Sequence, residues 1–171
     1  MMTARATGLV SIPDDLSSEE AAPILCAGIA TFNALKKCGA EAGDTVAVLG
    51  IGGLGHMALQ YARKMGFRVI AVGRGADIPD LAIELGAHRY IDSNSENAVE
   101  ILQKMGGAKA VLTTIGDAGT VADLVPALAP EGRLVILGVA KDPLPVSTGF
   151  LVGGERSVIG SITGSPFENE K

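Results

Sequence analysis

The stretch Thr45-Val46-Ala47-Val48-Leu49-Gly50-Ile51-Gly52-Gly53-Leu54-Gly55 decides the fold that this sequence predicts. Its first half is almost entirely apolar, which is typical of a strand buried on both faces of a parallel sheet. Its glycines match the pattern G-x-G-x-x-G, and apolar residues then recur at helical spacing as far as Met65. Strand, glycine turn and helix in this order indicate a dinucleotide-binding site, whose pyrophosphate lies on free N–H groups at the positive helix end. A tight turn without a ligand is the alternative.

Composition narrows the possible partners. The chain has 171 residues, 47% of them hydrophobic and 19% charged, with 23 glycines and a net charge of −5. These values suit one domain with a buried sheet, and without a cluster of basic residues neither nucleic acid nor an anionic membrane is expected as a partner. No apolar run reaches the ~18 residues of a spanning helix, and residues 1–15 lack a secretory signal, so a cytoplasmic protein is expected. Two cysteines indicate no disulfide framework.

Strand and helix patterns alternate along the chain. Residues 1–16 are expected to be an irregular lead-in, residues 17–163 a dinucleotide-binding domain, and residues 164–171 a frayed polar tail. Strands are predicted over 45–50, 68–72, 89–92, 110–115, 133–139 and 157–162. Helices are predicted between them over 53–65, 78–85, 97–105 and 119–128. This alternation predicts an α/β fold, a Rossmann-type doubly wound six-stranded parallel sheet in three layers, α/β/α.

A further helix is predicted ahead of the first strand. Ser17 and Glu20 have the spacing of a capping box, and Pro23 suits a first helical turn, where its missing N–H is not needed. The helix is expected to end at Lys37. Near the other end of the chain, prolines and glycines between residues 143 and 154 predict a loop that leads to the last strand.

The second contact with a dinucleotide is predicted at the end of the second strand. A carboxylate there usually binds the ribose 2′-hydroxyl of NAD, but this strand ends in Val72-Gly73-Arg74-Gly75. A guanidinium at Arg74 could bind a 2′-phosphate through two hydrogen bonds. NADP is therefore favoured over NAD. Arg74 as a solvated turn residue, with Asp77 as a helix cap, remains an alternative, and Asp77 reaching the ribose would restore NAD.

Two segments and their spacing resemble the zinc-dependent medium-chain alcohol dehydrogenases. The first is Ala22-Pro23-Ile24-Leu25-Cys26-Ala27-Gly28, and 24 residues after Cys26 begins the glycine pattern that ends in His56. The segment Leu81-Ala82-x-x-Leu85-Gly86-Ala87 is similar to the family as well. The resemblance covers nearly the whole chain, and it implies that Cys26 is one of three protein ligands of a catalytic zinc. A thiolate near a helix N-terminus suits that role. Cys38 has no such match and is expected to be structural.

The resemblance also shows what this chain lacks. Family members take their other zinc ligands from an amino-terminal catalytic domain, and only 25 residues precede Cys26. The four-cysteine structural zinc lobe and the segment that returns to the catalytic domain are missing too. The chain is thus expected to be a cofactor domain that binds nucleotide but has no catalytic residue of its own and does not turn over a small alcohol or aldehyde.

Other cofactor contacts are implied by position in the family, all at carboxyl ends of strands. Thr114-Ile115-Gly116 is expected to border the adenosine ribose, and Leu137-Gly138-Val139 and Ser161-Ile162-Thr163 to contact the nicotinamide. Ordinary packing at strand ends is the alternative. The cofactor-binding residues expected in total are Gly50, Gly52, Gly53, Leu54, Gly55, Gly73, Arg74, Thr114, Ile115, Gly116, Leu137, Gly138, Val139, Ser161, Ile162 and Thr163.

Three other positions carry expectations of their own. The family usually has Thr four residues after the zinc cysteine, whereas this chain has Ala30 there and Thr31 next to it. His56 is expected to pack or cap the helix after the glycines. His88 is expected to be solvated in a loop. Neither histidine has a second ligand at metal spacing.

Several readings of function remain open from sequence. A cofactor domain of a zinc-free quinone or enoyl reductase would not need Cys26 as a ligand. A non-catalytic nucleotide-sensing module would explain the absent catalytic half, and a methyltransferase is a further alternative with a similar glycine loop. The family's sixth strand lies at a sheet edge and an apolar loop over 143–152 precedes it here, so a homodimer is expected.

Overall fold

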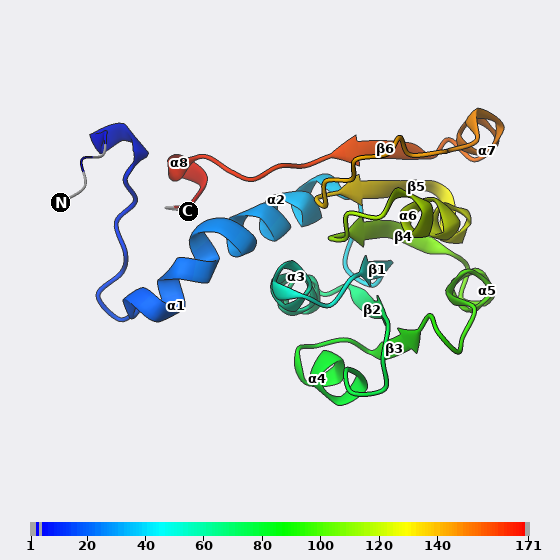
Figure 1. Cartoon of the computed structure of the whole chain (residues 1–171), viewed down its shortest axis with the longest axis horizontal. Coiled ribbons are helices and arrows are strands. Elements are labelled where there is room, and N and C mark those ends of the chain that lie inside the picture. Colours follow the sequence, from blue (N-terminus) through cyan, green and yellow to red (C-terminus); the bar gives the residue numbers. More distant parts are fainter. Residues whose placement is uncertain (1–2, 4, 170–171) are drawn as a thin grey trace.

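The protein is a single parallel sheet with helices on both faces. The computed structural model describes residue 3 and residues 5–169. The strands are β1 (Thr45–Leu49), β2 (Arg68–Gly73), β3 (Arg89–Asp92), β4 (Ala108–Thr113), β5 (Leu128–Ile136) and β6 (Ser157–Gly160). They are ordered β3-β2-β1-β4-β5-β6, and every pair is parallel (Figure 1). The predicted six-stranded, doubly wound sheet is therefore confirmed.

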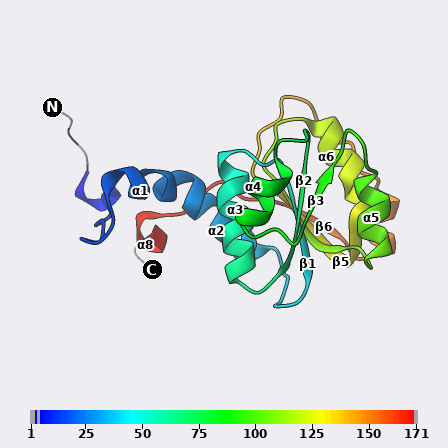
Figure 2. The same cartoon turned by 90° about the horizontal axis from the view of Figure 1, so that it is seen from below.

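The helices divide between the two faces of the sheet, which confirms the three layers (Figure 2). The α-helices are α1 (Ser18–Pro23), α2 (Ile29–Lys37), α3 (Gly53–Lys64), α4 (Pro79–Glu84), α5 (Ala98–Lys104), α6 (Ala118–Leu124), α7 (Thr148–Gly153) and α8 (Pro166–Asn169). A π-helical segment, Ile24–Gly28, joins α1 to α2, and short 3-10 turns occupy Ala6–Gly8 and Val125–Ala127. Among the described residues no helix is long and apolar enough to cross a membrane.

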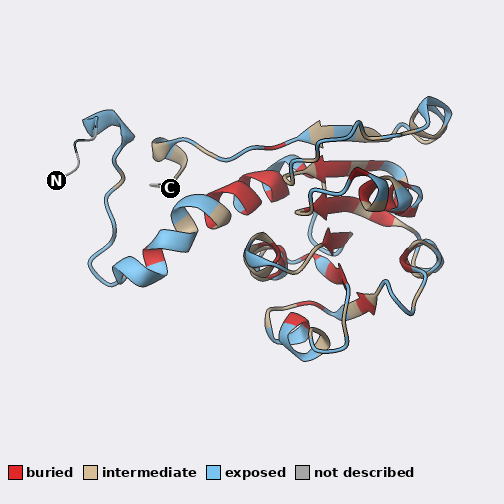
Figure 3. Cartoon of the chain, in the orientation of Figure 1, coloured by how far each residue is buried: buried red, intermediate tan, exposed pale blue. Residues whose placement is uncertain are grey.

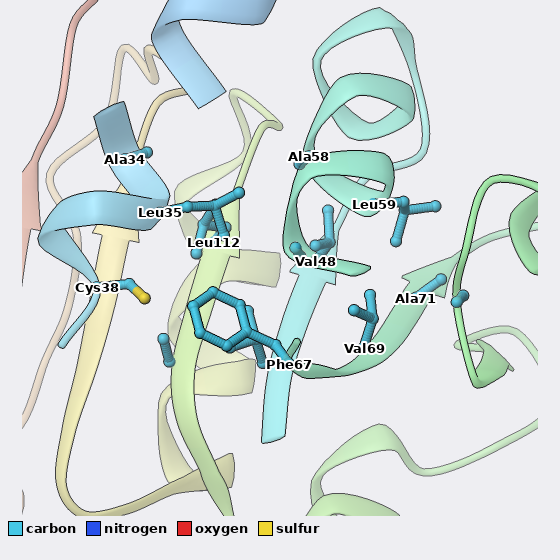
Figure 4. Packing of buried hydrophobic residues seen from close by; sticks show 14 of the residues in the cluster. Ala34, Leu35, Cys38, Val48, Ala58, Leu59, Phe67, Val69, Ala71 and Leu112 are labelled. Atoms are coloured by element: carbon cyan, nitrogen blue, oxygen red, sulfur yellow. The ribbon is translucent and has the colours of Figure 1, made fainter. Parts of the chain in front are cut away.

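Two apolar layers hold the helices to the sheet. On one face α2, α3 and α4 pack on alternate residues of the central strands (Figure 4). On the other face α5, α6 and the 3-10 turn after α6 pack on the residues between them. The central strands are thus buried on both sides (Figure 3), which accounts for their nearly continuous apolar sequence. Cys38 is fully buried in the first layer, as its structural role predicts, and burial raises the pKa of its thiol.

The helical run predicted from the Ser17 cap to Lys37 is confirmed, but a π-helical segment divides it into α1 and α2. The capping box is confirmed, because the Ser17 hydroxyl accepts from the N–H of Glu20 and the Glu20 carboxylate accepts from the N–H of Ser17. Pro23 does not lie in the first turn, however, but closes α1. Proline offers no N–H to the preceding turn, and the chain widens into the π-helical segment directly after it. Helix α1 and this segment extend away from the sheet (Figure 1).

The expectation of a frayed tail was wrong for the described part of it. Residues Pro166–Asn169 form α8, which is capped by Ser165 through a hydrogen bond between its N–H and the Glu168 carboxylate, 2.8 Å. The amide of Asn33 in α2 donates to the Thr163 carbonyl at 3.3 Å and to Glu168 at 3.4 Å. These side-chain contacts hold α8 beside the α1–α2 helix. Residues 170–171 lie outside the described part.

Two expectations around β5 and β6 also need correction. The predicted loop before β6 contains α7, whose start is capped by the Ser147 hydroxyl accepting from the N–H of Phe150 at 3.3 Å. Strand β5 begins at Leu128 and ends at Ile136, whereas it was predicted over 133–139. Its register against β4 shifts near its start, where Glu131 adopts φ 57° next to Gly132. Such a bulge places turn-forming residues inside a strand, so the sequence pattern does not show where the strand begins.

His88 was expected to be solvated; it is exposed, but one ring nitrogen is hydrogen-bonded and the other lies against an arginine. Its Nδ1 accepts the backbone N–H of Val69 in β2 at 2.9 Å, while its own N–H donates to the Val69 carbonyl at 2.8 Å. Its Nε2 contacts the guanidinium of Arg63. Desolvation lowers the pKa of His88, and the charge of Arg63 lowers it further. The neutral ring therefore extends the pairing between β2 and the segment entering β3.

We expect protonation of His88 to weaken this junction. Because the pKa in the folded state lies below the unfolded value, the stabilisation is complete above about pH 6.5 and is lost as the pH falls through the folded-state pKa. In His88→Asn, Oδ1 retains an acceptor for Val69 but does not titrate. Between about pH 7.5 and pH 5 the melting temperature of the natural chain should fall about 1–2 °C further than that of the variant, a small effect because solvent screens an exposed ring. Parallel melting curves for both proteins would contradict the expectation.

Candidate functional site

The glycine turn between β1 and α3 is constrained by its neighbours at two positions. Gly50 has φ +93°, and a Cβ there would lie 2.5 Å from the Ile115 side chain and 2.6 Å from the Thr114 hydroxyl. A Cβ on Gly55 would overlap the carbonyl oxygen of Gly50. The first glycine thus permits the turn, and the last one lets α3 lie directly against the end of β1.

The glycines in the middle of the turn are not constrained by the protein. A Cβ on Gly52 or on Gly53 would meet no atom within 4 Å. Gly52 caps α3 without any side-chain bond, and the first turn of α3 carries no acidic residue. The first N–H groups of a helix have no partner within the helix, and they carry its positive partial charge. This open cradle fits the pyrophosphate of a dinucleotide, which would occupy the space that a Cβ would take.

The turn is tied to the end of β4. The Thr114 hydroxyl donates to the carbonyls of Leu49 and Gly50 at 3.1 and 3.0 Å, so it is engaged in holding the turn. The ends of β4 and β5 also approach closely. A Cβ on Gly116 would lie 2.6 Å from the Val139 carbonyl oxygen, and one on Gly138 would overlap Ile115. The residues 114–116 and 137–139, which were predicted as cofactor contacts, thus lie side by side at the carboxyl ends of β4 and β5.

A cavity of about 320 Å³ opens beside the turn. It is lined by Leu49, Gly50, Ile51, Gly73, Arg74, Ile78, Ser93, Ile115, Asp117 and Thr120. A second cavity of about 230 Å³ continues from it between the starts of α5 and α6, and the two share Leu49, Arg74, Ser93 and Thr120. Of the described residues that line them, Arg74 is the one with a positive charge. The first cavity brings the predicted residues Gly50, Gly73, Arg74 and Ile115 together at the carboxyl ends of the strands, where open α/β sheets bind ligands.

Arg74 is exposed but has a defined partner, so it is not merely a solvated turn residue. Its Nη2 donates to the Thr120 hydroxyl at 3.0 Å. Asp77 does not cap α4, because the N-cap of that helix is Ile78. The nearest carboxylate on the neighbouring strand is Asp92, which sequence reasoning missed; its Oδ1 accepts the N–H of Gly75 at 3.3 Å. Register pairs Asp92 with Gly73, a relation that only strand pairing reveals.

The predicted nicotinamide contacts divide into two groups. Val139 and Ile162 are 92% and 89% exposed, so they leave an apolar surface at the carboxyl ends of β5 and β6. Ser161, in contrast, is buried, and its hydroxyl accepts from Lys37 of α2 at 3.2 Å. Its polar side chain is therefore directed toward helix α2.

Cys26 lies in a different environment from the one expected. It is exposed in the π-helical segment and follows α1, so it is not at a helix N-terminus and that argument for its thiolate does not hold. Among the described residues no three His, Cys, Asp or Glu side chains come together to hold a metal, so this chain alone does not fit a zinc site.

Thr31 is fully buried, and its hydroxyl donates to the helix carbonyls of Ala27 and Gly28 at 2.7 and 3.0 Å.

Known proteins are similar to this chain in sequence and in fold. The model of the zinc-binding dehydrogenase family matches residues 53–171. The alcohol dehydrogenase patD of Aspergillus clavatus is 41% identical over 170 residues, which are 98% of this chain and 44% of that protein. The solved alcohol dehydrogenase of the archaeon Aeropyrum pernix matches with a TM-score of 0.84 and 32% identity, over 92% of this chain and 48% of that one. A zinc-binding dehydrogenase of Sinorhizobium meliloti, solved bound to NADP, matches with a TM-score of 0.80 and 29% identity. The match covers 86% of this chain and 45% of that one.

Fold and glycine turn together define a Rossmann-type α/β domain. The chain belongs to the zinc-binding dehydrogenase family, and it corresponds to the cofactor-binding domain of the zinc-dependent medium-chain alcohol dehydrogenases. It spans less than half the length of each relative named above.

We expect Gly55→Ala to destabilise the fold. The added methyl would overlap the Gly50 carbonyl, and relieving this overlap must move α3 from β1 at a cost of about 2 kcal/mol. The melting temperature should fall by about 4–8 °C. Gly53→Ala is the matched control, because its methyl enters open space and alanine favours a helix, so its stability should be equal or slightly higher. Equal melting temperatures for Gly55→Ala and the natural chain would show that the contact is not tight.

Proposed function

We propose that this chain is the nicotinamide-dinucleotide-binding domain of a zinc-dependent alcohol dehydrogenase. The observation that carries the proposal is the contrast within the glycine turn. The chain itself requires glycine at Gly50 and Gly55, but it leaves Gly52 and Gly53 facing open space at the start of α3. Glycines without a packing reason, placed at a positive helix end, are accounted for by the close approach of a phosphate.

Each part of the dinucleotide is assigned to one region at the carboxyl ends of the strands. The pyrophosphate lies on α3, and the adenosine lies in the cavity between Gly73 and Ile115. The nicotinamide lies over the ends of β5 and β6, where Val139 and Ile162 present apolar surface. When bound, the cofactor supplies the hydride chemistry between an alcohol and its aldehyde. This chain binds and orients the cofactor, and it excludes water from one face of the ring.

NADP is favoured over NAD because of the charge beside the adenosine cavity. Arg74 is directly after β2 and borders both cavities. The neighbouring Asp92 carboxylate is engaged by the N–H groups of Gly75 and Asn94, at 3.3 and 3.0 Å, which reduces its repulsion of an incoming phosphate. The NADP bound to the relative from Sinorhizobium meliloti is in keeping with this preference.

Zinc belongs to the proposed parent protein rather than to this chain. Cys26 would supply one thiolate ligand, and its exposure leaves the sulfur accessible to ligands from outside the chain. One thiolate cannot complete the tetrahedral set of a zinc site. The isolated chain is therefore expected to bind cofactor without oxidising a small alcohol.

A homodimer through β6 is also proposed. Strand β6 lies at the edge of the described sheet, and Ser157-Val158-Ile159-Gly160 carries no charge that would block pairing with a second copy. Val158 is 37% exposed, and Val152 at the end of α7 is 79% exposed nearby in sequence. The opposite edge strand, β3, begins with the charged Arg89, which makes it the less suitable edge.

Titration calorimetry with NADPH and NADH at one salt concentration tests the cofactor proposal. We expect NADPH to bind at least about tenfold more tightly, a difference of ~1.4 kcal/mol. Gly52→Ala should weaken both cofactors equally, because its backbone is extended and its methyl enters only the phosphate space. Its melting temperature should fall by no more than about 2–4 °C, because alanine caps a helix less well than glycine. Arg74→Ala should weaken NADPH alone.

The alternatives have separate outcomes. Equal or stronger binding of NADH would refute the phosphate role of Arg74 and direct attention to Asp77. Binding of neither cofactor would mean that the glycine turn is structural only. Reduction of NADP by the isolated chain in the presence of ethanol would contradict the expected inactivity.

Sedimentation velocity over a range of concentrations tests the dimer. We expect a dimer for the natural chain and a monomer for Val158→Lys, because a charge at an edge strand opposes pairing between sheets. Ile83→Lys is the matched control, since it places the same charge at a 49% exposed position on α4, away from β6. A monomeric natural chain at high concentration, or an equal effect of both variants, would refute the β6 interface.

A further inference from the structure

The Arg74 side chain is held by helix α6 at the carboxyl end of the sheet. Arg74 follows β2, whereas Thr120 lies in the first turn of α6, after β4, and the two are 46 residues apart in sequence. The Arg74 Nη2 donates to the Thr120 Oγ1 at 3.0 Å. Both residues line both cavities, so this hydrogen bond lies where the cavities join.

Thr120 is itself held by the residue that caps α6. Asp117, the N-cap of α6, accepts the backbone N–H of Thr120 at 2.7 Å. Hydrogen bonds from Thr120 keep the pKa of Asp117 below its usual range, and the charge of Arg74 contributes in the same direction. The Asp117 carboxylate only accepts and the Arg74 guanidinium only donates, so Thr120 accepts from Arg74 through its hydroxyl oxygen and donates to Asp117 through its backbone N–H. Donors and acceptors therefore run in one direction from Arg74 through Thr120 to Asp117.

The bond to Thr120 leaves Arg74 free to bind an anion. A guanidinium has five N–H donors, of which Thr120 takes one. The remaining donors include a parallel pair suited to two phosphate oxygens. A long exposed side chain loses rotamer freedom when it binds a ligand, and a partner that fixes it beforehand lowers this cost.

We propose that Thr120 is a positioning residue that sets the preference for NADP by holding the Arg74 guanidinium at the mouth of the adenosine cavity. There it meets the 2′-phosphate of the ribose. The inference rests on the proposed function. It adds Thr120, on α6, to Arg74, after β2, as a residue that determines whether NADP or NAD binds more tightly. NADH lacks the 2′-phosphate, so its affinity does not depend on Thr120.

Calorimetric titrations of Thr120→Val and Thr120→Ser with NADPH and NADH test the role. Valine retains the branched shape and the backbone N–H that Asp117 caps, but it offers Arg74 no oxygen. We expect Thr120→Val to bind NADPH about fivefold more weakly, the effect of one lost hydrogen bond, with NADH changed by less than about twofold. Thr120→Ser should retain the natural preference. The probes 2′,5′-ADP and 5′-AMP should repeat this pattern, since they carry the adenosine half alone.

A double-mutant cycle distinguishes positioning from packing. In the Arg74→Ala background, Thr120→Val should have no further effect on NADPH, because its effect passes through the guanidinium. Equal losses for NADPH and NADH, or the same loss with and without Arg74, would refute the positioning role. If the natural chain binds both cofactors but does not prefer NADPH, this inference fails while dinucleotide binding stands. If it binds neither, the proposed function itself fails.

Discussion

The close approach of α3 to the end of β1 is the constraint on which the rest of the site depends. Because Gly55 has no side chain, the helix starts directly against the Gly50 carbonyl. This contact aims the free N–H groups of the first turn along the carboxyl edge of the sheet. The adjacent Thr114 hydroxyl then fixes the turn to β4. The proposed phosphate cradle and the proposed adenosine cavity thus share one wall, and the position of each follows from the same backbone contact.

Much of the fold could be predicted because the sheet is buried on both faces. Double burial gives each central strand a continuous apolar run, and the glycine turn marks the first crossover. The errors fall where this signal fails. The bulge at Glu131 hides the start of β5, and α7 is too short and too exposed to show a helical period. Pro23 was placed in the wrong turn because a proline can also precede a π-helical segment.

The site was less predictable than the fold. Arg74 stands out in sequence because it replaces an expected carboxylate, but its bond to Thr120 joins two segments that only the sheet brings together. Asp92 reaches Gly75 through strand pairing, and the Ser161 hydroxyl is directed to Lys37 by packing against α2. A sequence pattern specifies which residues end each strand, whereas the direction of their polar groups is decided by neighbours distant in the chain.

The helical segments that precede the sheet, α1 and α2, differ in burial. Beyond the π-helical segment, α2 is largely buried against the sheet, with Ala34 and Leu35 in its core. Before it, α1 buries only Ala21 among its six residues and extends from the body (Figure 3). Amide protons in α1 are therefore expected to exchange with solvent through local fraying, and those in β1 and β4 through global unfolding. We expect the opening free energy to rise from α1 to α2, with the step at the π-helical segment that carries Cys26.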